Sequence, residues 1–314
     1  MKKNGVSYIV FNRSILIALA LIAICNLETV AQQKVQFTQY MFNGLVINPA
    51  YAGAEEALSL TLIQRKQWAN IESSPSTQTL AAHTLFKKKH FGLGLSIIND
   101  RIGVHRNLSA MSDFAYHLKV SENSYLSMGL QAGINNRKSN YASLAGNTNV
   151  DPKLFDAAVS YTAFELGAGF YFRTPRLHVG LSAPELLPES FNINDTASVR
   201  LSNINFFLFS KYRITVSERI DVEPSLLLKY LVGIPLSYDI NMNLIYRKVL
   251  TVGLSYRKKE SIDFMLKGQF TPQLQFGYSY DHPIGEVSRV SNGSHELMIN
   301  YVFRYVQSKV EPPR

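Results

Sequence analysis

The feature that most constrains this chain is a series of segments of about ten residues in which apolar and polar residues alternate. In one of them Leu126, Met128 and Leu130 alternate with Ser127 and Gly129. A period of two is typical of a β-strand that has one apolar face. Beyond residue 55 no long stretch has the 3.6-residue period of an amphipathic helix. The sequence therefore predicts an all-β fold.

The polar face of these segments separates a membrane barrel from a soluble sandwich. A solvated sheet face usually carries Lys and Glu, whereas these segments carry mostly Gly, Ser, Gln, Asn and Tyr. Only 18% of the residues are charged, against roughly 25% in average soluble domains. Such a face suits a confined polar lumen, with the apolar face turned to lipid. Backbone groups in lipid must all be paired, so we expect a closed transmembrane antiparallel β-barrel.

The segments amount to about 14 strands, an even number as in bacterial single-chain barrels. The expected strands are 58–68, 77–86, 91–100, 107–119, 125–134, 163–173, 177–182, 201–214, 220–230, 235–246, 250–257, 262–270, 274–280 and 295–305. The even-numbered connections between them are short, and several odd-numbered ones are long. Outer-membrane barrels have short periplasmic turns and long surface loops. We therefore expect the connections 135–162, 183–200 and 281–294 to face the outside.

The N-terminus resembles a secretory signal peptide, which we place at residues 1–31. Basic residues precede an apolar run from Ile15 to Ile24, and the small residues of Thr29–Ala31 follow it. That run is short for a membrane-spanning helix of ~20 residues, which favours cleavage over a membrane anchor. The single cysteine, Cys25, lies inside this segment. We expect export to the outer membrane of a Gram-negative cell, a plug or mouth segment at 32–57, the barrel at 58–305 and a short polar tail at 306–314.

The segment before the first strand does not alternate and carries a distinct motif. Asn48 and Pro49 predict a turn, because the Asn side chain bonds nearby backbone and Pro fixes φ. Gly53 allows a tight entry into the strand. The sequence predicts a short helical or irregular segment here. The residues we single out in it and at the end of the first strand are Gln39, Tyr40, Asn48, Pro49, Tyr51, Gly53, Arg65, Gln67 and Trp68.

These motifs together resemble the PorP/SprF family of Bacteroidetes outer-membrane proteins. The matching features are Gln-Tyr-Met-Phe-Asn at 39–43, Ile-Asn-Pro-Ala-Tyr-Ala-Gly at 47–53, Arg-x-Gln-Trp at 65–68, Gly-Leu-Gly-Leu at 92–95, Asn-Asp-x-Ile-Gly from 99 to Gly103, and Gly-Leu-Ser-Ala-Pro at 180–184. Gly44 stands where the family often has proline, and Asn70 where glycine is usual. The first third of the chain carries most of the resemblance.

The resemblance implies a non-enzymatic barrel of the type IX secretion and gliding machinery. Members of this family help to secrete large surface proteins or to hold them at the surface, often adhesins with C-terminal sorting domains. They also associate with the periplasmic ring of the machinery and with its peptidoglycan-linked parts. Outer-membrane lipid and lipopolysaccharide complete the expected partners. Nucleic acid is excluded despite the formal net charge of +9, because the basic residues are scattered and the chain is expected to be exported.

Two readings of the selected residues stay open at this point. These residues, together with Asp100 and Gly103, either pack the N-terminal segment inside the barrel or against its periplasmic mouth, or form a surface that docks a partner. Trp68 also suits a membrane interface, and Arg65 could bind a carboxylate or a plug carbonyl. Ion pairs are expected inside the lumen. Their candidate members are Asp100, Asp113, Asp239 and Asp263 with Lys119, Lys229 and Lys267.

A general porin and an outer-membrane hydrolase are the alternative functions. A porin would conduct ions, whereas a plugged lumen would conduct little. A hydrolase would need a Ser–His pair, for which His83, His117 and His178 lie on expected strands. No nucleophile motif selects one of them, and no histidine spacing fits a metal site. We expect no catalytic residue, no cofactor and no metal.

Overall fold

The computed structural model describes residues 35–86, 90–141, 158–187, 189–194, 197–201, 204–231 and 234–303. The expected signal peptide at 1–31 and the expected tail at 306–314 lie outside these residues. None of the described helices is long and apolar enough to cross a membrane.

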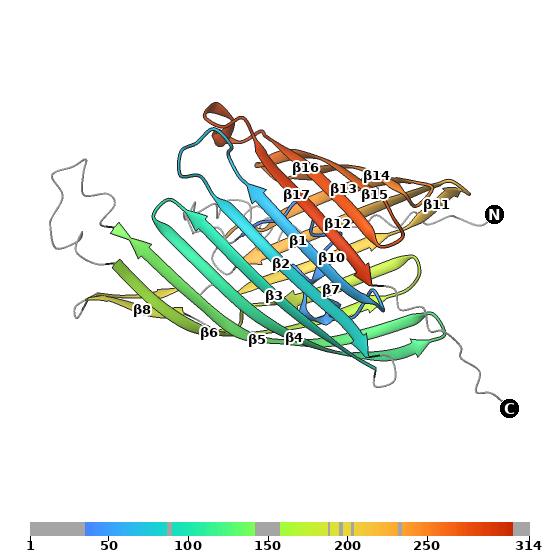
Figure 1. Cartoon of the computed structure of the whole chain (residues 1–314), viewed down its shortest axis with the longest axis horizontal. Helices are drawn as coiled ribbons and strands as arrows, with labels where there is room; N and C mark the ends of the chain where they lie inside the picture. Colours follow the sequence, from blue (N-terminus) through green and yellow to red (C-terminus); the bar gives the residue numbers. More distant parts are fainter. Residues whose placement is uncertain are drawn as a thin grey trace, which may run out of the picture.

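The described chain forms a closed antiparallel β-barrel (Figure 1). The strands are β1 (Leu58–Lys66), β2 (Ser76–Phe86), β3 (Phe91–Ile102), β4 (His105–Ser121), β5 (Ser124–Asn140), β6 (Ala158–Arg173), β7 (Leu177–Ala183), β8 (Glu189–Asn194), β9 (Ala197–Leu201), β10 (Asn205–Tyr212), β11 (Ile214–Ser217), β12 (Ile220–Leu231), β13 (Ser237–Tyr246), β14 (Leu250–Arg257), β15 (Ser261–Gln269), β16 (Leu274–Pro283) and β17 (Ser294–Phe303). Three 3-10 helices accompany them, η1 (Gly44–Val46), η2 (Pro49–Tyr51) and η5 (Glu286–Arg289).

Most strands pair with their neighbours in the sequence, and three further pairings close the ring. β1 pairs with β17, and β10 pairs with both β7 and β12. β11 also pairs with β12, so β10 and β11 act as one barrel strand that is interrupted at Arg213. The 15-stranded sheet is therefore a barrel of 14 strands, as the sequence predicts. β8 and β9 form a separate hairpin.

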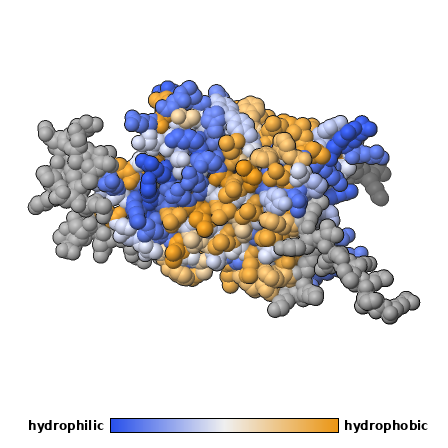
Figure 2. All heavy atoms as spheres, viewed as in Figure 1, coloured by the Kyte–Doolittle hydropathy of each residue, from blue (hydrophilic) through white to orange (hydrophobic). Residues whose placement is uncertain are grey.

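Alternation sorts the side chains into an outer and a lumen environment, and Figure 2 shows the outer one. On β5, Leu130 and Ile134 point outward with 65% and 52% of their surface exposed, whereas Ser127 is fully buried on the lumen side. Similar outward Leu, Ile, Phe and Tyr residues make an apolar belt around the barrel. An exposed apolar belt is stable only against lipid, which is the environment of a transmembrane barrel.

The two ends of the barrel differ in their connections. One end carries turns such as 122–123, 174–176 and 218–219. The opposite end carries the connections 67–75 and 284–293, together with the stretch between β7 and β10 that contains the β8–β9 hairpin. We call these the short-turn end and the long-connection end. From the rule for outer-membrane barrels we expect them to face the periplasm and the exterior, respectively.

Strands β5 and β6 are longer than the alternation indicates, and this corrects the expected connection at 135–162. β5 continues to Asn140 and β6 begins at Ala158. The apolar alternation stops at Ile134 because the strands leave the lipid there, while backbone pairing continues. The expected connection 183–200 contains β8 and most of β9. Asp281, expected in a connection, belongs to β16 and is buried.

Candidate functional site

The lumen holds the chain that precedes β1, residues 35–57, which we call the plug. In Figure 1 it is the blue segment that lies within the barrel. It contacts Arg65, Asp281 and Glu296 near the long-connection end, and His83 and His117 nearer the short-turn end. Its two single helical turns, η1 and η2, confirm the expected short helical or irregular segment. Three sets of contacts fix it in place.

The first anchor is a buried carboxylate that clasps two successive plug amides. The backbone N–H groups of Thr38 and Gln39 each donate to Glu296, over N···O distances of 2.9 Å. The Thr38 hydroxyl donates to Asp281 at 2.7 Å. The Arg65 guanidinium contacts both carboxylates and the hydroxyl: Asp281 at 2.7 Å, Thr38 Oγ1 at 2.9 Å and Glu296 at 3.2 Å. Charge-assisted hydrogen bonds of this kind are about twice as strong as neutral ones.

This anchor belongs to a larger ion cluster on the lumen wall. Arg257 lies 3.6–3.8 Å from carboxylate oxygens of Asp239, Asp263 and Asp281, and Lys229 lies 2.9 Å from Asp239. The side chains of Arg65, Asp281 and Glu296 are exposed by only 1%, 4% and 0%. Charges buried to this degree are stable only while they remain paired. The plug therefore completes a charge network that the barrel wall cannot satisfy by itself.

Of the expected lumen charges, some form ion pairs and others do not. Lys229 and Asp263 are in the cluster above. Asp113 instead accepts from the Gln131 amide at 2.8 Å, and Asp100 accepts from the Thr77 hydroxyl at 2.6 Å. Lys267 lies over the Phe42 ring of the plug, with its Nζ 4.2 Å from the ring centre. Lys119 is exposed near the short-turn end.

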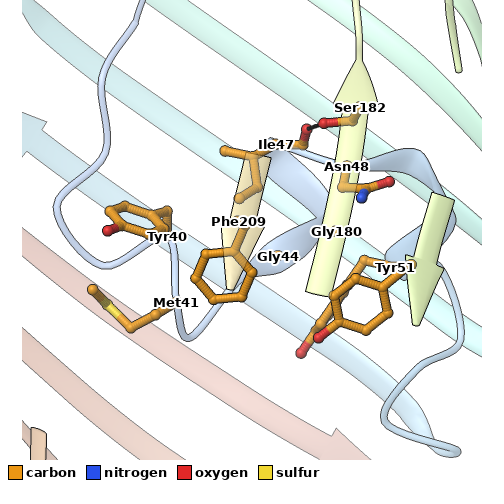
Figure 3. A pocket seen from close by; sticks show the side chains of 10 residues that line it. Tyr40, Met41, Gly44, Ile47, Asn48, Tyr51, Gly180, Ser182 and Phe209 are labelled. Atoms are coloured by element: carbon orange, nitrogen blue, oxygen red, sulfur yellow. Dashed lines mark hydrogen bonds between the residues drawn. The ribbon is translucent and has the colours of Figure 1, made fainter. Parts of the chain in front are cut away.

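The second anchor is the turn at Asn48 and Pro49, which the local sequence itself explains. The Asn48 side chain caps η2 by accepting from the Ala50 N–H at 2.9 Å, and Pro49 occupies the first helical turn. Asn48 Nδ2 then donates to the carbonyl of Phe170 on β6 at 2.9 Å. One residue earlier, the Ile47 carbonyl accepts from the Ser182 hydroxyl of β7 at 2.6 Å (Figure 3). A single capping residue thus also ties the plug to the barrel wall.

The third anchor consists of two buried histidines, His83 and His117, which lie nearer the short-turn end than the Asn48 turn does. His83 Nδ1 accepts from the Gly53 N–H at 3.2 Å. His117 Nε2 donates to the Ala52 carbonyl at 2.8 Å, and the Ser127 hydroxyl donates to His117 Nδ1 at 2.7 Å. Gly53 has a φ of +81°, a conformation that favours glycine. The chain turns there before it enters β1.

Glycines on the lumen face of the strands give the plug backbone room to approach. A Cβ atom on Gly92 would lie 2.0 Å from the Ala52 carbonyl oxygen, and one on Gly129 would lie 2.2 Å from the Ala50 nitrogen. On Gly169 it would lie 2.2 Å from Asn48 Oδ1, and on Gly277 2.1 Å from Gln39 Oε1. Real atoms cannot approach so closely, so a side chain at Gly92 or Gly129 would displace plug backbone, and one at Gly169 or Gly277 would push aside the Asn48 or Gln39 side chain. Gly92 and Gly129 are therefore the seat of the plug.

Aromatic side chains fill the remaining space around a small cavity between the plug and strands β6, β7 and β10 (Figure 3). Tyr40 meets Phe209 edge-on with ring centres 6.0 Å apart, and Tyr51 meets Tyr171 at 5.3 Å. Such edge-to-face pairs stabilise by about 0.5–1.5 kcal/mol beyond area burial. Gly44 lines the same cavity, and a Cβ there would lie 2.6 Å from the Tyr51 ring.

The residues that the sequence singles out fall into two groups. Gln39, Tyr40, Asn48, Pro49, Tyr51, Gly53 and Arg65 come together in the lumen, where they hold or form the plug. The others lie at the long-connection end around the 67–75 connection. The Gln67 N–H donates to the Pro75 carbonyl, the Trp68 N–H to Ser294 Oγ, and the Gly103 N–H to the Ser73 carbonyl.

Sequence reasoning missed the barrel residues that receive the plug. Glu296, Asp281 and Arg257 were not selected, although each occupies a lumen-facing position of a strand whose other face meets lipid. Glu296 alternates with Leu297, which is 56% exposed. The signal that would have identified Glu296 is an acidic residue at a lumen-facing position of a strand that has no other charge. The sequence predicted His83 and His117 as lumen histidines bonded to neighbouring polar groups, with a Ser–His pair as the alternative, and did not predict that they bind plug backbone.

The polar side chains of the site bind the plug and are not arranged for catalysis. Ser127 and His117 do form a hydrogen-bonded pair, but both are buried and the second ring nitrogen of His117 binds plug backbone. A nucleophile needs access to its substrate, so this pair does not resemble a catalytic site. Within the described residues no group of three or more His, Cys, Asp or Glu is placed to hold a metal ion. What the arrangement does physically is obstruct the lumen.

Comparisons with known proteins agree with this fold. A family model described as "Type IX secretion system membrane protein PorP/SprF" matches residues 29–301. Among solved structures, the CymD monoaromatic hydrocarbon channel has a TM-score of 0.51 at 14% identity, covering 84% of this chain and 92% of CymD. The outer membrane protein Omp33 of Acinetobacter baumannii has a TM-score of 0.47 at 9% identity, covering 80% of this chain and 98% of Omp33. No curated protein matches the sequence. At these identities the likeness to CymD extends to the barrel fold alone.

Proposed function

Since this chain belongs to the PorP/SprF family of type IX secretion system membrane proteins, we propose that it works by binding other proteins and not by conducting solutes or by catalysis. It aids the secretion or surface attachment of large adhesin-type proteins. The observation that carries the proposal is the plug. A lumen crossed by a segment that is clamped by Arg65, Asp281 and Glu296 leaves the outer surfaces of the barrel as the places for function.

Each end of the barrel has a role in this proposal. The long-connection end, with the extended strands β4–β6 and the β8–β9 hairpin, meets a secreted protein that carries a C-terminal sorting domain. The short-turn end meets the periplasmic ring or the peptidoglycan-linked components of the machinery. Arg176, Arg219 and Lys248 are exposed in those turns and offer positive charge to an acidic partner. Export through a signal peptide at 1–31 and a role in gliding motility are parts of the same proposal.

Deletion of the gene in the host is the experiment that tests this function. Proteins at the cell surface are released by protease shaving and quantified by mass spectrometry, with and without complementation by the intact chain. We expect one or a few large adhesins to disappear from the surface while other outer-membrane proteins stay at their normal level. Loss of all type IX cargo would instead indicate a core component. An unchanged surface with altered uptake of solutes would contradict the proposal.

A solute channel is the second candidate, and the likeness of fold to CymD is the observation that favours it. The two candidates differ in what the intact lumen permits. A channel has to pass ions or small solutes with the plug in place, whereas a protein-binding barrel does not. The conductance of the purified chain therefore separates them.

A further inference from the structure

Strands β3–β5 extend beyond the apolar belt at the long-connection end, and there they carry a row of positive charge on their outer face. Strand register defines three successive outward rows that cross β2 to β6 toward the long-connection end. The first row is apolar and consists of Leu80, Ile97, Ala110, Ile134 and Phe164. The second is mostly amides and hydroxyls and consists of Gln78, Asn99, Leu108, Asn136 and Thr162. The third consists of Ser76, Arg101, Arg106, Lys138 and Ser160.

The second row marks where the lipid contact ends. Its polar groups bind one another, so they need no water: Asn99 donates to Gln78 at 2.9 Å, and Asn136 donates to Thr162 at 2.8 Å. The first row below it is a lipid face, with Ile134 exposed by 52% and Phe164 by 56%. Residues four apart on a strand lie ~13 Å apart along it. With a strand tilt of about 35–45°, the third row lies roughly 10 Å beyond the first along the membrane normal.

The third row places three cations side by side without a counter-charge. Arg101 is directly opposite Arg106, and Arg106 is directly opposite Lys138. Side chains so paired have Cβ atoms about 4.5–5.5 Å apart, and like charges there repel. All three are exposed, and none makes an ion pair with a described residue. The neighbouring acid, Asp100, points to the other face and binds Thr77.

Lys66 extends the same row by one strand. It lies opposite Ser76 on β2, and its Nζ donates to the Ser74 carbonyl at 3.2 Å, which leaves its charge unbalanced. The opposite wall of the barrel is different. There the outward residues near the long-connection end include Tyr238 and Tyr256, and the cation that follows β14, Lys258, lies over the Tyr238 ring with its Nζ 5.5 Å from the ring centre. Cations that lie directly opposite one another on neighbouring strands thus occur in the sector of β3–β5 and not among the paired residues of β12–β15.

We propose that the row of Arg101, Arg106 and Lys138 binds the phosphate groups of a phosphorylated glycolipid, lipid A, in the outer leaflet. The row lies roughly 5 Å along the membrane normal beyond the second row, where the lipid contact ends, and this places it in the headgroup zone, which adds ~5–8 Å on each side of the hydrocarbon core. Arg forks bind phosphate oxygens in a bidentate manner and Lys supplies a further point charge. A phosphate between these side chains would replace mutual repulsion by attraction. Hydrocarbon tails of the same lipid would lie along Ile134 and Phe164.

Lipid binding by the purified full-length chain tests this proposal. The triple variant R101Q/R106Q/K138Q is compared with a matched control, R176Q/R219Q/K248Q, which removes the same charge from exposed positions at the short-turn end. Native mass spectrometry in detergent measures bound diphosphoryl lipid A, dephosphorylated lipid A and phosphatidylglycerol. We expect the first triple variant to bind diphosphoryl lipid A at least tenfold more weakly than the parent, and the control to bind it as the parent does.

Three outcomes would overturn the proposal. The first is equal binding of diphosphoryl lipid A by the parent and the R101Q/R106Q/K138Q variant. The second is equal binding of dephosphorylated lipid A and diphosphoryl lipid A by the parent. The third is full displacement of lipid A by inorganic phosphate at millimolar concentration, which would indicate a site for the free anion. Each variant is first checked for the heat-sensitive gel mobility of a folded barrel, and single substitutions replace the triple one if it does not fold.

Discussion

At the residue scale, Arg65 is the group on which the plug depends most. Its guanidinium joins Asp281, Glu296 and Thr38, and removing it leaves Glu296 without an ion-pair partner and Asp281 with only the longer contact to Arg257. Breaking a buried ion pair in this way typically costs about 3–5 kcal/mol. We therefore expect Arg65→Ala to lower the free energy of unfolding by that order and to expose the plug. Thermal unfolding in detergent and limited proteolysis that maps cleavage within residues 35–57 measure both effects.

Lys119→Ala is the matched control for this change. Lys119 also carries a positive charge, but it is exposed near the short-turn end. Surface substitutions of this kind usually change stability by less than ~0.5 kcal/mol. If Arg65→Ala resembles Lys119→Ala in both measurements, the ion cluster does not hold the plug. Arg65→Lys should fall between the two, because Lys keeps the charge but loses the fork that reaches two carboxylates.

A second residue-scale prediction concerns the seat of the plug. Gly129 lies under η2, so that a Cβ there would lie 2.2 Å from the Ala50 nitrogen. Gly129→Leu should therefore displace η2 and open residues 35–57 to proteolysis, while the barrel itself still folds. Gly268→Ala is the control, since its Cβ would meet only the movable ring of Phe270, at 3.2 Å. An equally protected plug in both variants would show that the plug does not rest on Gly129.

At the element scale, the sequence predicts the strands well where they cross lipid and poorly beyond it. Period-two patterning located all the transmembrane strands because lipid demands one apolar face. It ended β5 at Ile134, although pairing continues to Asn140, because side chains above the lipid can be polar on both faces. The turn at Asn48 was predictable from local chemistry. Its partners Phe170 and Ser182 were not, because they meet it only through tertiary folding.

The protruding ends of β4–β6 make the orientation of the barrel testable. Lys138 lies at the long-connection end and Lys248 in a short turn. The only cysteine of the chain is Cys25, so a single introduced thiol can be followed. We expect a membrane-impermeant maleimide to label Lys138→Cys in intact cells, and to label Lys248→Cys only after the outer membrane is permeabilised. The unmodified parent is the control, and the reverse pattern would invert the assignment of outside and inside.

At the scale of the whole molecule, the barrel and its plug act as one closed body, and electrical conductance reports on that closure. Three anchors hold residues 35–57 across the lumen, at Glu296, Asn48 and His117. Because these contacts fill the path of an ion, the purified parent should show little steady conductance in a planar bilayer. Glu296→Gln combined with Gly129→Leu removes the carboxylate clasp and the seat of η2, so its conductance should rise severalfold.

Glu122→Gln combined with Gly268→Ala provides the control for that measurement, because Glu122 is exposed in a short turn and Gly268 lies away from the plug. The conductance of this control should be as low as that of the parent. Steady conductance by the parent itself would show that ions pass the plug, and would favour the solute channel. If the plug variant conducts no ions although proteolysis shows that its plug is released, other lumen side chains must also close the barrel. A closed parent that opens only when the plug is released would leave the outer surfaces as the working parts of this protein.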